Sequence, residues 1–194
     1  MSNVAPYEIL TGVGELYLAP VGTTMPEVDA APGASWISLG DTQDGVTVTA
    51  DQDIEEIRVD QETGPVKATR TEESLVLETK LAAMTLENLA YVLGNTVTDT
   101  PAASGVIGTR EVGMYRGQSV STYAFLFRGT SAYGDYPAQY EVPMGYFGGA
   151  MEAEYTKDGN AAIPCEFHAL VDPNAATAAE RFGVLVMQDA AALP

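Results

Sequence analysis

The sequence predicts a mainly β protein, of the sandwich or barrel type, with one short α-helix and long loops. Several segments alternate apolar and polar residues with the period of a β-strand, and one short segment repeats its apolar residues at helical spacing. Gly, Pro, Asn and Asp residues punctuate the chain between these segments. With 194 residues, of which 46% are hydrophobic, the chain can bury one sizeable core, so we expect a single domain over residues 1–194.

Turn residues followed by β-branched residues mark the first strands. Residues 15–18 predict a strand, and Gly12-Val13-Gly14 before them lacks the third glycine of a nucleotide-binding loop. Asp44-Gly45 predicts a turn that leads into the alternating residues 46–49. A weaker strand pattern continues through residues 54–59.

Three segments rich in turn residues predict long loops. They cover residues 20–35, 51–66 and 94–109. Gly64-Pro65 interrupts the second segment, and Pro101 lies within the third. We expect the third loop to separate two halves of the chain.

Residues 68–81 predict a strand with one dry side and one wet side. One side carries Glu73, Leu75, Leu77 and Leu81. The other side carries Arg70, Glu72, Ser74, Glu78 and Lys80. Period-2 alternation of this kind places one side against a core and the other in water.

A short helix is expected directly after this strand. Thr85 is a suitable N-cap and Gly94 can end the helix in the left-handed conformation. The residues at helical spacing, which we expect to pack on the β core, are Leu86, Leu89, Ala90 and Leu93.

The second half repeats the strand signature. Four further strands are expected at residues 119–128, 139–147, 150–156 and 162–171. Lys157-Asp158-Gly159-Asn160 predicts a tight hairpin turn between the last two, and residues 183–188 predict a C-terminal strand.

The inventory of reactive residues argues against an enzyme. The chain has one cysteine, Cys165, and one histidine, His168, so a His- or Cys-based zinc site has at most two such ligands. No Gly-x-Ser-x-Gly sequence supports a serine hydrolase. We expect a buried, structural thiol at Cys165, a structural His168, and no cofactor.

Two acidic patterns leave weaker alternatives. Residues 51–55 imitate the start of a calcium loop, but Glu56 stands where that loop requires glycine. Paired carboxylates such as Glu72 and Glu73 could serve acid–base catalysis on sugars, although their spacing carries little specificity. A solvated surface is the simpler interpretation of both.

The charge balance disfavours nucleic acid as a bound ligand. The chain has 27 acids against 9 Lys and Arg residues, giving a formal net charge of −18. Phosphate binding needs clusters of Lys and Arg that release counterions, and the basic residues here are isolated. The first residues resemble no signal peptide and no segment is long and apolar enough for a membrane span, so we expect neither secretion nor membrane insertion.

The order of motifs along the chain resembles the major tail tube proteins of long-tailed bacteriophages, the siphophages. The resemblance rests on Gly14–Pro20, Trp36–Thr42 with Asp44–Val46, Glu72–Lys80 with Thr85–Ala90, and Lys157–Pro164 with Phe167–Asp172. Each motif is a weak pattern by itself, but together they extend over nearly the full chain.

This resemblance implies a non-enzymatic virion protein, made in the host cytoplasm, that assembles with itself. The implied subunit is a β-sandwich with one helix, and six subunits form rings whose inner strands join into one continuous β-barrel. Stacked rings make a channel that DNA passes without binding during ejection into the host. The implied partners are a tape-measure protein and the tail terminator and distal tail proteins; contractile tails share the fold type.

Two sets of polar residues become candidate functional residues. The first is an inter-subunit arm, because residues 41–62 carry eight acids against Arg58 alone and gain little from a private core. Its members are Asp53, Glu55, Glu56, Arg58, Asp60 and Glu62. The second is a set of wet-side carboxylates that we expect to line the channel: Glu72, Glu78, Glu152, Glu154 and Glu166.

Two other function classes remain open from the sequence. One is a non-enzymatic β-sandwich module of an appendage, with an adhesive role. The other is a β-sandwich hydrolase, which requires two carboxylates converging in a concave pocket.

Overall fold

The computed structural model describes residues 13–152 and 161–192 and is mainly β. Its strands are β1 Glu15–Pro20, β2 Ile37–Ser38, β3 Thr42–Ile57, β4 Lys67–Leu81, β5 Val97–Thr100, β6 Thr109–Val112, β7 Tyr123–Thr130, β8 Pro137–Phe147, β9 Ile163–Ala169 and β10 Val184–Met187. The helix α1 spans Leu86–Leu93, and a 3₁₀ turn, η2, spans Ala178–Glu180.

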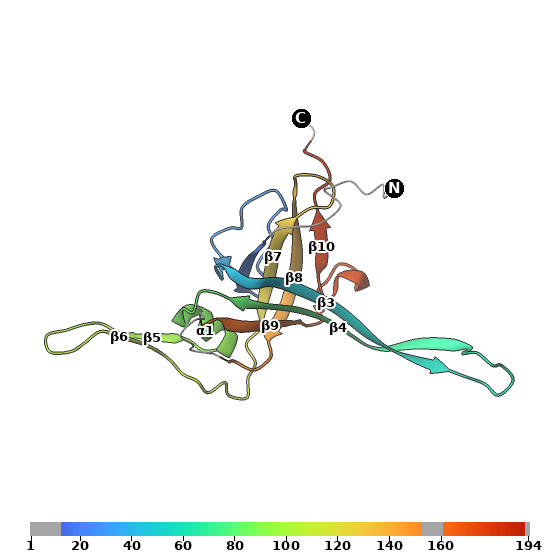
Figure 1. Ribbon diagram of the computed structural model, residues 1–194, viewed down its shortest axis with the longest axis horizontal. Coiled ribbons are helices and arrows are strands. Elements are labelled where there is room, and N and C mark those ends of the chain that lie inside the picture. Colours follow the sequence, from blue (N-terminus) through green and yellow to red (C-terminus); the bar gives the residue numbers. More distant parts are fainter. Residues whose placement is uncertain (1–12, 153–160, 193–194) are drawn as a thin grey trace.

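Eight strands form one antiparallel sheet that forks at β8. The order is β2-β1-β7-β8-β9-β4-β3, and β10 also pairs with β8. β10 pairs with residues 138–141 of β8, whereas β9 pairs with residues 145–147, so both lie along the edge of β8 opposite β7. In Figure 1, β7, β8 and β10 run upright while β3, β4 and β9 cross them. The fork therefore folds one sheet into two layers, as expected for a sandwich-like fold.

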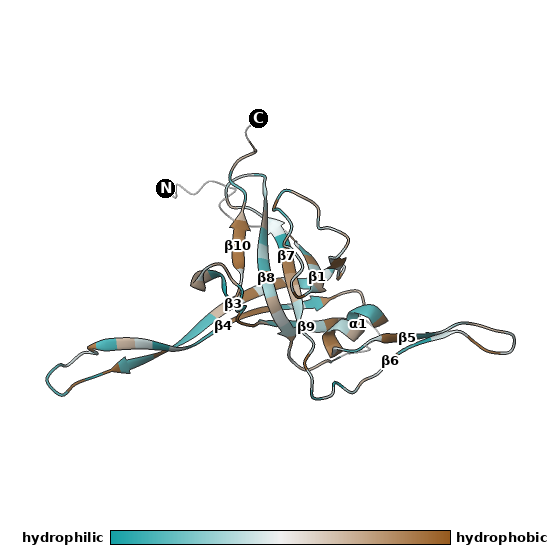
Figure 2. Ribbon diagram, turned by 180° about the vertical axis from the view of Figure 1, so that it is seen from behind, coloured by the Kyte–Doolittle hydropathy of each residue, from teal (hydrophilic) through white to brown (hydrophobic). Residues whose placement is uncertain are grey.

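The main core lies between these two layers. Alternate residues of each strand point into it, and the rings of Phe125 on β7 and Phe167 on β9 stack with centroids 4.6 Å apart. Its fully buried members include Leu16, Leu18, Leu77, Leu81, Val142 and Ile163. In Figure 2 the hydrophobic colour concentrates on the body and the projecting β3–β4 hairpin is largely hydrophilic.

A second, smaller cluster lies on the other face of β1 and β7. Trp36 packs there against Ala19 and Leu126. The segment 21–36 covers this face, and polar contacts hold it: Arg128 donates to the carbonyl oxygens of Glu27 and Ala30. Buried Gln139 donates to the carbonyl of Pro26 at 2.7 Å. This segment occupies the position of the loop expected at 20–35.

The helix begins and ends at the residues that the sequence indicates. The hydroxyl of Thr85 accepts a hydrogen bond from the backbone N–H of Asn88 at 3.2 Å, and Gly94 adopts a φ of 69°. Leu89, Ala90 and Leu93 are buried, and Leu86 packs at the margin of the core. Two buried residues were not expected, Val92 and Asn88; the Asn88 amide donates to the carbonyls of Leu39 and Ala83.

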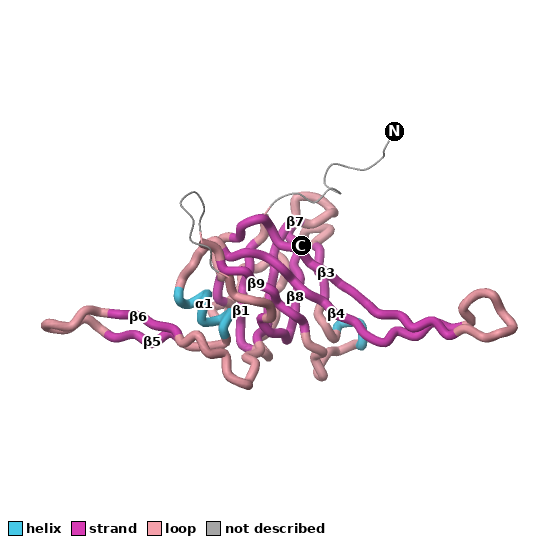
Figure 3. Tube along the Cα trace, turned by 60° about the horizontal axis from the view of Figure 1, so that its bottom comes forward, coloured by secondary structure: helices cyan, strands magenta, loops and turns pink. Residues whose placement is uncertain are grey.

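Two of the expected loops are wrong in extent, because both contain strands. β3 continues to Ile57 and β4 begins at Lys67, so the loop expected at 51–66 is reduced to residues 58–66. The segment expected as a loop at 94–109 contains β5 and the start of β6, which pair as a separate two-stranded sheet. Both are hairpins that project from opposite sides of the body (Figure 3). Such ribbons satisfy their backbone hydrogen bonds without a buried face, so they show no apolar alternation.

The strand expected at residues 150–156 differs as well. Residues 150–152 follow β8 without strand structure. Ala153, Tyr155 and the hairpin turn expected at 157–160 lie outside the described residues. The C-terminal strand expected at 183–188 corresponds to β10, which pairs with β8.

The burial of Leu89 leads to a stability prediction. Its side chain is 7% exposed, so Leu89→Ala leaves a cavity between α1 and the sandwich and lowers the free energy of unfolding by about 2–5 kcal/mol. Urea unfolding of the monomer measures this. Val171→Ala is the control, because Val171 is 48% exposed and its truncation should cost under about 0.5 kcal/mol. Equal effects of the two variants would contradict the packing.

Candidate functional site

An acidic pair lies on the outer face of β4 and β9. Along β4, Leu77 and Leu81 face the core, so Glu78 faces outward between them. On β9, Glu166 faces outward between buried Cys165 and Phe167. The register places Glu78 directly opposite Glu166. Like charges directly opposite one another destabilise a sheet, so burial of the core side, and not cross-strand attraction, fixes this register.

His168 holds Glu166 in place. The Nε2 atom of His168 lies 2.7 Å from a carboxylate oxygen of Glu166, and the imidazole stacks on Tyr146 with ring centroids 5.2 Å apart. A Cβ atom at Gly148 would lie 2.5 Å from this imidazole, so glycine leaves room for it. The single histidine of the chain therefore orients a surface carboxylate on the outer face.

The five carboxylates expected to line a channel do not all lie together. Glu78 and Glu166 are neighbours, but Glu72 lies further along β4, beyond the part that pairs with β9. Glu152 is exposed in the segment after β8, and Glu154 lies outside the described residues. Sequence alternation thus identifies wet positions, but only the strand register brings two of them together.

The hairpin of β3 and β4 forms a long acidic arm. We define the β3–β4 arm as residues 50–74. Every residue from Thr49 to Ser74 is solvent-exposed, on both faces of the hairpin. The candidate residues Asp53, Glu55, Glu56, Arg58, Asp60 and Glu62 all lie in it. Residues 51–55 are extended within β3, so they do not form the turn that a calcium loop requires.

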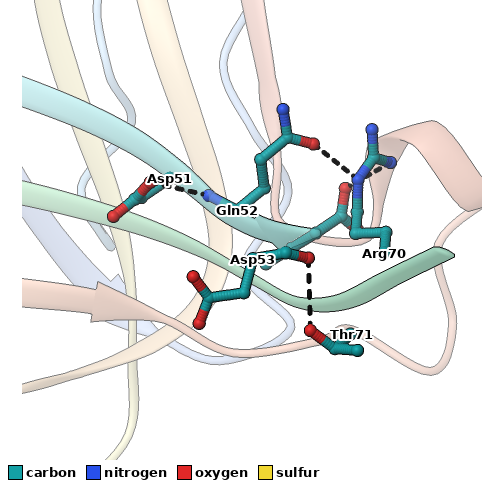
Figure 4. A network of polar contacts seen from close by, with 6 residues as sticks. Asp51, Gln52, Asp53, Arg70 and Thr71 are labelled. Atoms are coloured by element: carbon teal, nitrogen blue, oxygen red, sulfur yellow. Dashed lines mark hydrogen bonds and ion pairs between the residues drawn. The ribbon is translucent and has the colours of Figure 1, made fainter. Parts of the chain in front are cut away.

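Polar contacts and a bulge shape this arm (Figure 4). The Arg70 guanidinium donates to Gln52 at 2.7 Å and pairs with Glu73 at 2.7 Å. Thr71 is an extra residue between two register positions, and its hydroxyl donates to the carbonyl of Asp53 at 3.2 Å. Bulges increase the local twist of a hairpin, and exposed ion pairs contribute little stability. The backbone ladder, not a core, maintains the arm.

The second hairpin carries functional candidates that the sequence analysis missed. We define the β5–β6 arm as residues 97–112. Arg110 pairs with Glu87 of α1 at 2.7 Å and with Asp99 at 2.6 Å, and Asn95 donates to the carbonyl of Gly113 at 2.6 Å. The β-branched residues flanking Ser104-Gly105 are the sequence signal that could have revealed this hairpin.

The reactive groups of the described residues offer little chemistry. Burial raises the pKa of the Cys165 thiol to about 12, so a thiolate does not form at neutral pH. Among residues 13–152 and 161–192, no group of three His, Cys, Asp or Glu side chains could hold a metal ion. No helix in the same ranges is long and apolar enough to cross a membrane.

The comparisons with known proteins identify one family. The model of a phage tail tube protein family matches residues 1–191 of the chain. No curated protein matches the sequence.

The acidic pair leads to a second stability prediction. Glu78→Gln removes the repulsion across β4 and β9 and raises the free energy of unfolding by about 0.2–1 kcal/mol, with a smaller gain at high salt. Denaturant unfolding at two salt concentrations measures this. The control is Glu111→Gln, because exposed Glu111 on β6 faces uncharged Thr98. If Glu111→Gln raises the free energy of unfolding as much as Glu78→Gln does, the effect comes from net charge alone and not from the pair.

Proposed function

The chain belongs to the phage tail tube protein family, and from this premise we propose that it polymerises into stacked hexameric rings that form a DNA channel. The chain is a structural protein of the phage tail. In this proposal the rings close by strand pairing between subunits, the β3–β4 arm connects neighbouring subunits, and the acidic outer face of β4 and β9 lines the channel through which DNA is ejected.

The observation that carries this proposal is the open edge of β3. β3 ends the strand order of the sheet, and β4 is its only strand partner among the residues that the structure describes. Proteins protect long edges with Lys, Pro, charges or bulges. Here bulges interrupt the ladder at Gln43/Val46 and at Asp53/Ile54, but residues 46–50 between them contain no charge and no proline. An edge left open in this way suits pairing with a second copy, and repeated pairing closes a ring into one barrel.

The β3–β4 arm supports contact beyond the subunit's own body. A ribbon exposed on both faces contributes no core to its own subunit, so its length has no use in an isolated monomer. A second subunit that packs along it supplies the missing buried face. The residues proposed to make this contact are Asp53, Glu55, Glu56, Arg58, Asp60 and Glu62.

The acidic face supports the channel wall. Repetition of Glu78 and Glu166 around a ring, and then along a stack, produces bands of negative charge. Such bands keep phosphates from binding, so DNA slides past the wall. Glu72, Glu152 and Glu154 are proposed to extend these bands. Through the same assembly the tube contacts a tape-measure protein inside it and the tail terminator and distal tail proteins at its ends.

Shortening the arm tests the assembly. We replace residues 54–71 with Asn-Gly, so that Asp53 and Glu72, which are register partners, flank a tight turn. We expect the melting temperature of the monomer to be unchanged, because this part of the arm is exposed. We also expect that electron micrographs of the shortened chain show no tubes. The wild-type chain must form tubes of six-subunit rings under the same conditions. Normal tubes from the shortened chain would exclude the arm from assembly.

Charge reversal tests the channel wall. Phage carrying Glu78→Lys should assemble tails but eject DNA several-fold more slowly at low salt, because a ring of lysines attracts phosphates, and high salt should remove most of the delay. Glu111→Lys is the matched control, since it makes the same change on the β5–β6 arm. Ejection kinetics followed with a DNA-binding dye measure both. Equal ejection rates at low salt would place Glu78 outside the channel.

A further inference from the structure

The end of the β5–β6 arm is apolar and uncharged, in contrast to the rest of the surface. Residues 100–109 contain no charged side chain, although the chain has a formal net charge of −18. Val106 is 53% exposed and Ile107 is 80% exposed. In Figure 2 part of this loop carries the hydrophobic colour, far from the body. An isoleucine this exposed at the end of a projection gains nothing within its own chain.

The loop is built to hold these two side chains in place. Ala103 and Val106 exchange two backbone hydrogen bonds, of 3.0 and 2.9 Å, around Ser104-Gly105. Gly105 has a φ of 76°, which glycine adopts without strain. These backbone hydrogen bonds present Val106 and Ile107 on a structured turn, so less conformational entropy is lost when they bind.

A groove of about 260 Å³, whose wall is uncharged and has both apolar and polar atoms, lies on the body. It is bounded by β3, β7, β8 and β10, and its lining includes Val46, Val48, Phe127, Tyr140, Leu185 and Met187. Leu185 is 44% exposed, and no lining residue in the described chain carries a charge at neutral pH. Its volume is below the roughly 300–1,000 Å³ of small-molecule sites, so it suits a few side chains.

We propose that the Val106–Ile107 turn of one subunit inserts into this groove of a second copy of the chain. The inference rests on the proposed self-assembly and names a contact within it. Two subunits that each carry a charge of −18 repel one another, and close approach is least costly where neither surface has a charge to desolvate. The turn and the groove are two such surfaces.

The contact is of the head-to-tail kind. The turn and the groove are different surfaces of one chain, so each subunit gives its turn to one neighbour and receives a turn from another, as rings and stacks require. Two side chains bury far less than the roughly 800 Å² per partner of a stable interface. The contact therefore adds to the larger strand and arm contacts. Once those contacts have joined two subunits, the turn and the groove are already close together, so the turn binds as it would within one molecule.

Cysteine cross-linking tests the contact. Tubes of the double variant Ile107→Cys with Leu185→Cys should give a ladder of covalent multimers on mild oxidation; buried Cys165 stays unreactive. Tubes with Ile107→Cys and Val171→Cys are the control, because Val171 is 48% exposed and lies outside the groove. Absence of a ladder from the first pair, an equal ladder from the control pair, or dimers from Ile107→Cys alone would each overturn the proposal.

A charge introduced on the turn provides a second readout. Ile107→Glu should leave the monomer melting temperature unchanged and raise the critical concentration for tube formation by about tenfold or more, the factor for one buried apolar side chain. Met114→Glu is the matched control, because it makes the same apolar-to-acid change at a side chain that is 64% exposed and lies beyond the arm, and it should leave the critical concentration within about twofold. If Ile107→Glu assembles like the wild type, the proposed insertion of the turn is wrong, but the proposed tube is not contradicted. If the wild-type chain forms no tubes, the proposed function itself is wrong.

Discussion

The register of β4 between β3 and β9 is the constraint on which the rest of the structure depends. Leu77 and Leu81 face the core from this strand, and burial of their side chains fixes which residues face outward. A slip of one residue would expose both leucines and bury Glu78. The same strand then leaves the body and becomes one side of the β3–β4 arm. One register therefore determines the core, the acidic face and the direction of the arm.

Much of this frame could be predicted from the sequence, because burial leaves a periodic pattern. Alternation identified Leu77 and Leu81 as core residues and Glu78 and Glu166 as wet ones, and the positions of Thr85 and Gly94 indicated the ends of the helix. The prediction of a mainly β, sandwich-like fold is confirmed. The ends of the helix depend on residues a few positions away in the sequence, and the alternation depends on the burial of one face of a strand.

The rest could not be predicted, for two physical reasons. Ribbons such as residues 51–57 and 97–100 are stabilised by backbone hydrogen bonds with both faces in water, so their side chains carry no period. Contacts between distant segments also leave no local trace. Arg128 holds Ala30 and Glu27 across about a hundred residues of chain, and the pairing of Glu78 with Glu166 depends on the order of strands.

The distribution of charge explains how so acidic a chain can assemble. A destabilising pair such as Glu78 and Glu166 costs at most about 1 kcal/mol, which burial of a single leucine on the opposite side of the strand outweighs. Acids can therefore accumulate on the outer face without loss of the fold. Between subunits, close approach is least costly at surfaces that have no charge to desolvate. Residues 46–50 on the β3 edge and residues 100–109 on the β5–β6 arm are two uncharged stretches of this kind. Both lie on strands or turns with backbone or apolar groups still exposed. In the proposed assembly, contact at these uncharged stretches lowers the cost of bringing two acidic subunits together, while the acids on the outer face give any enclosed channel a negative wall.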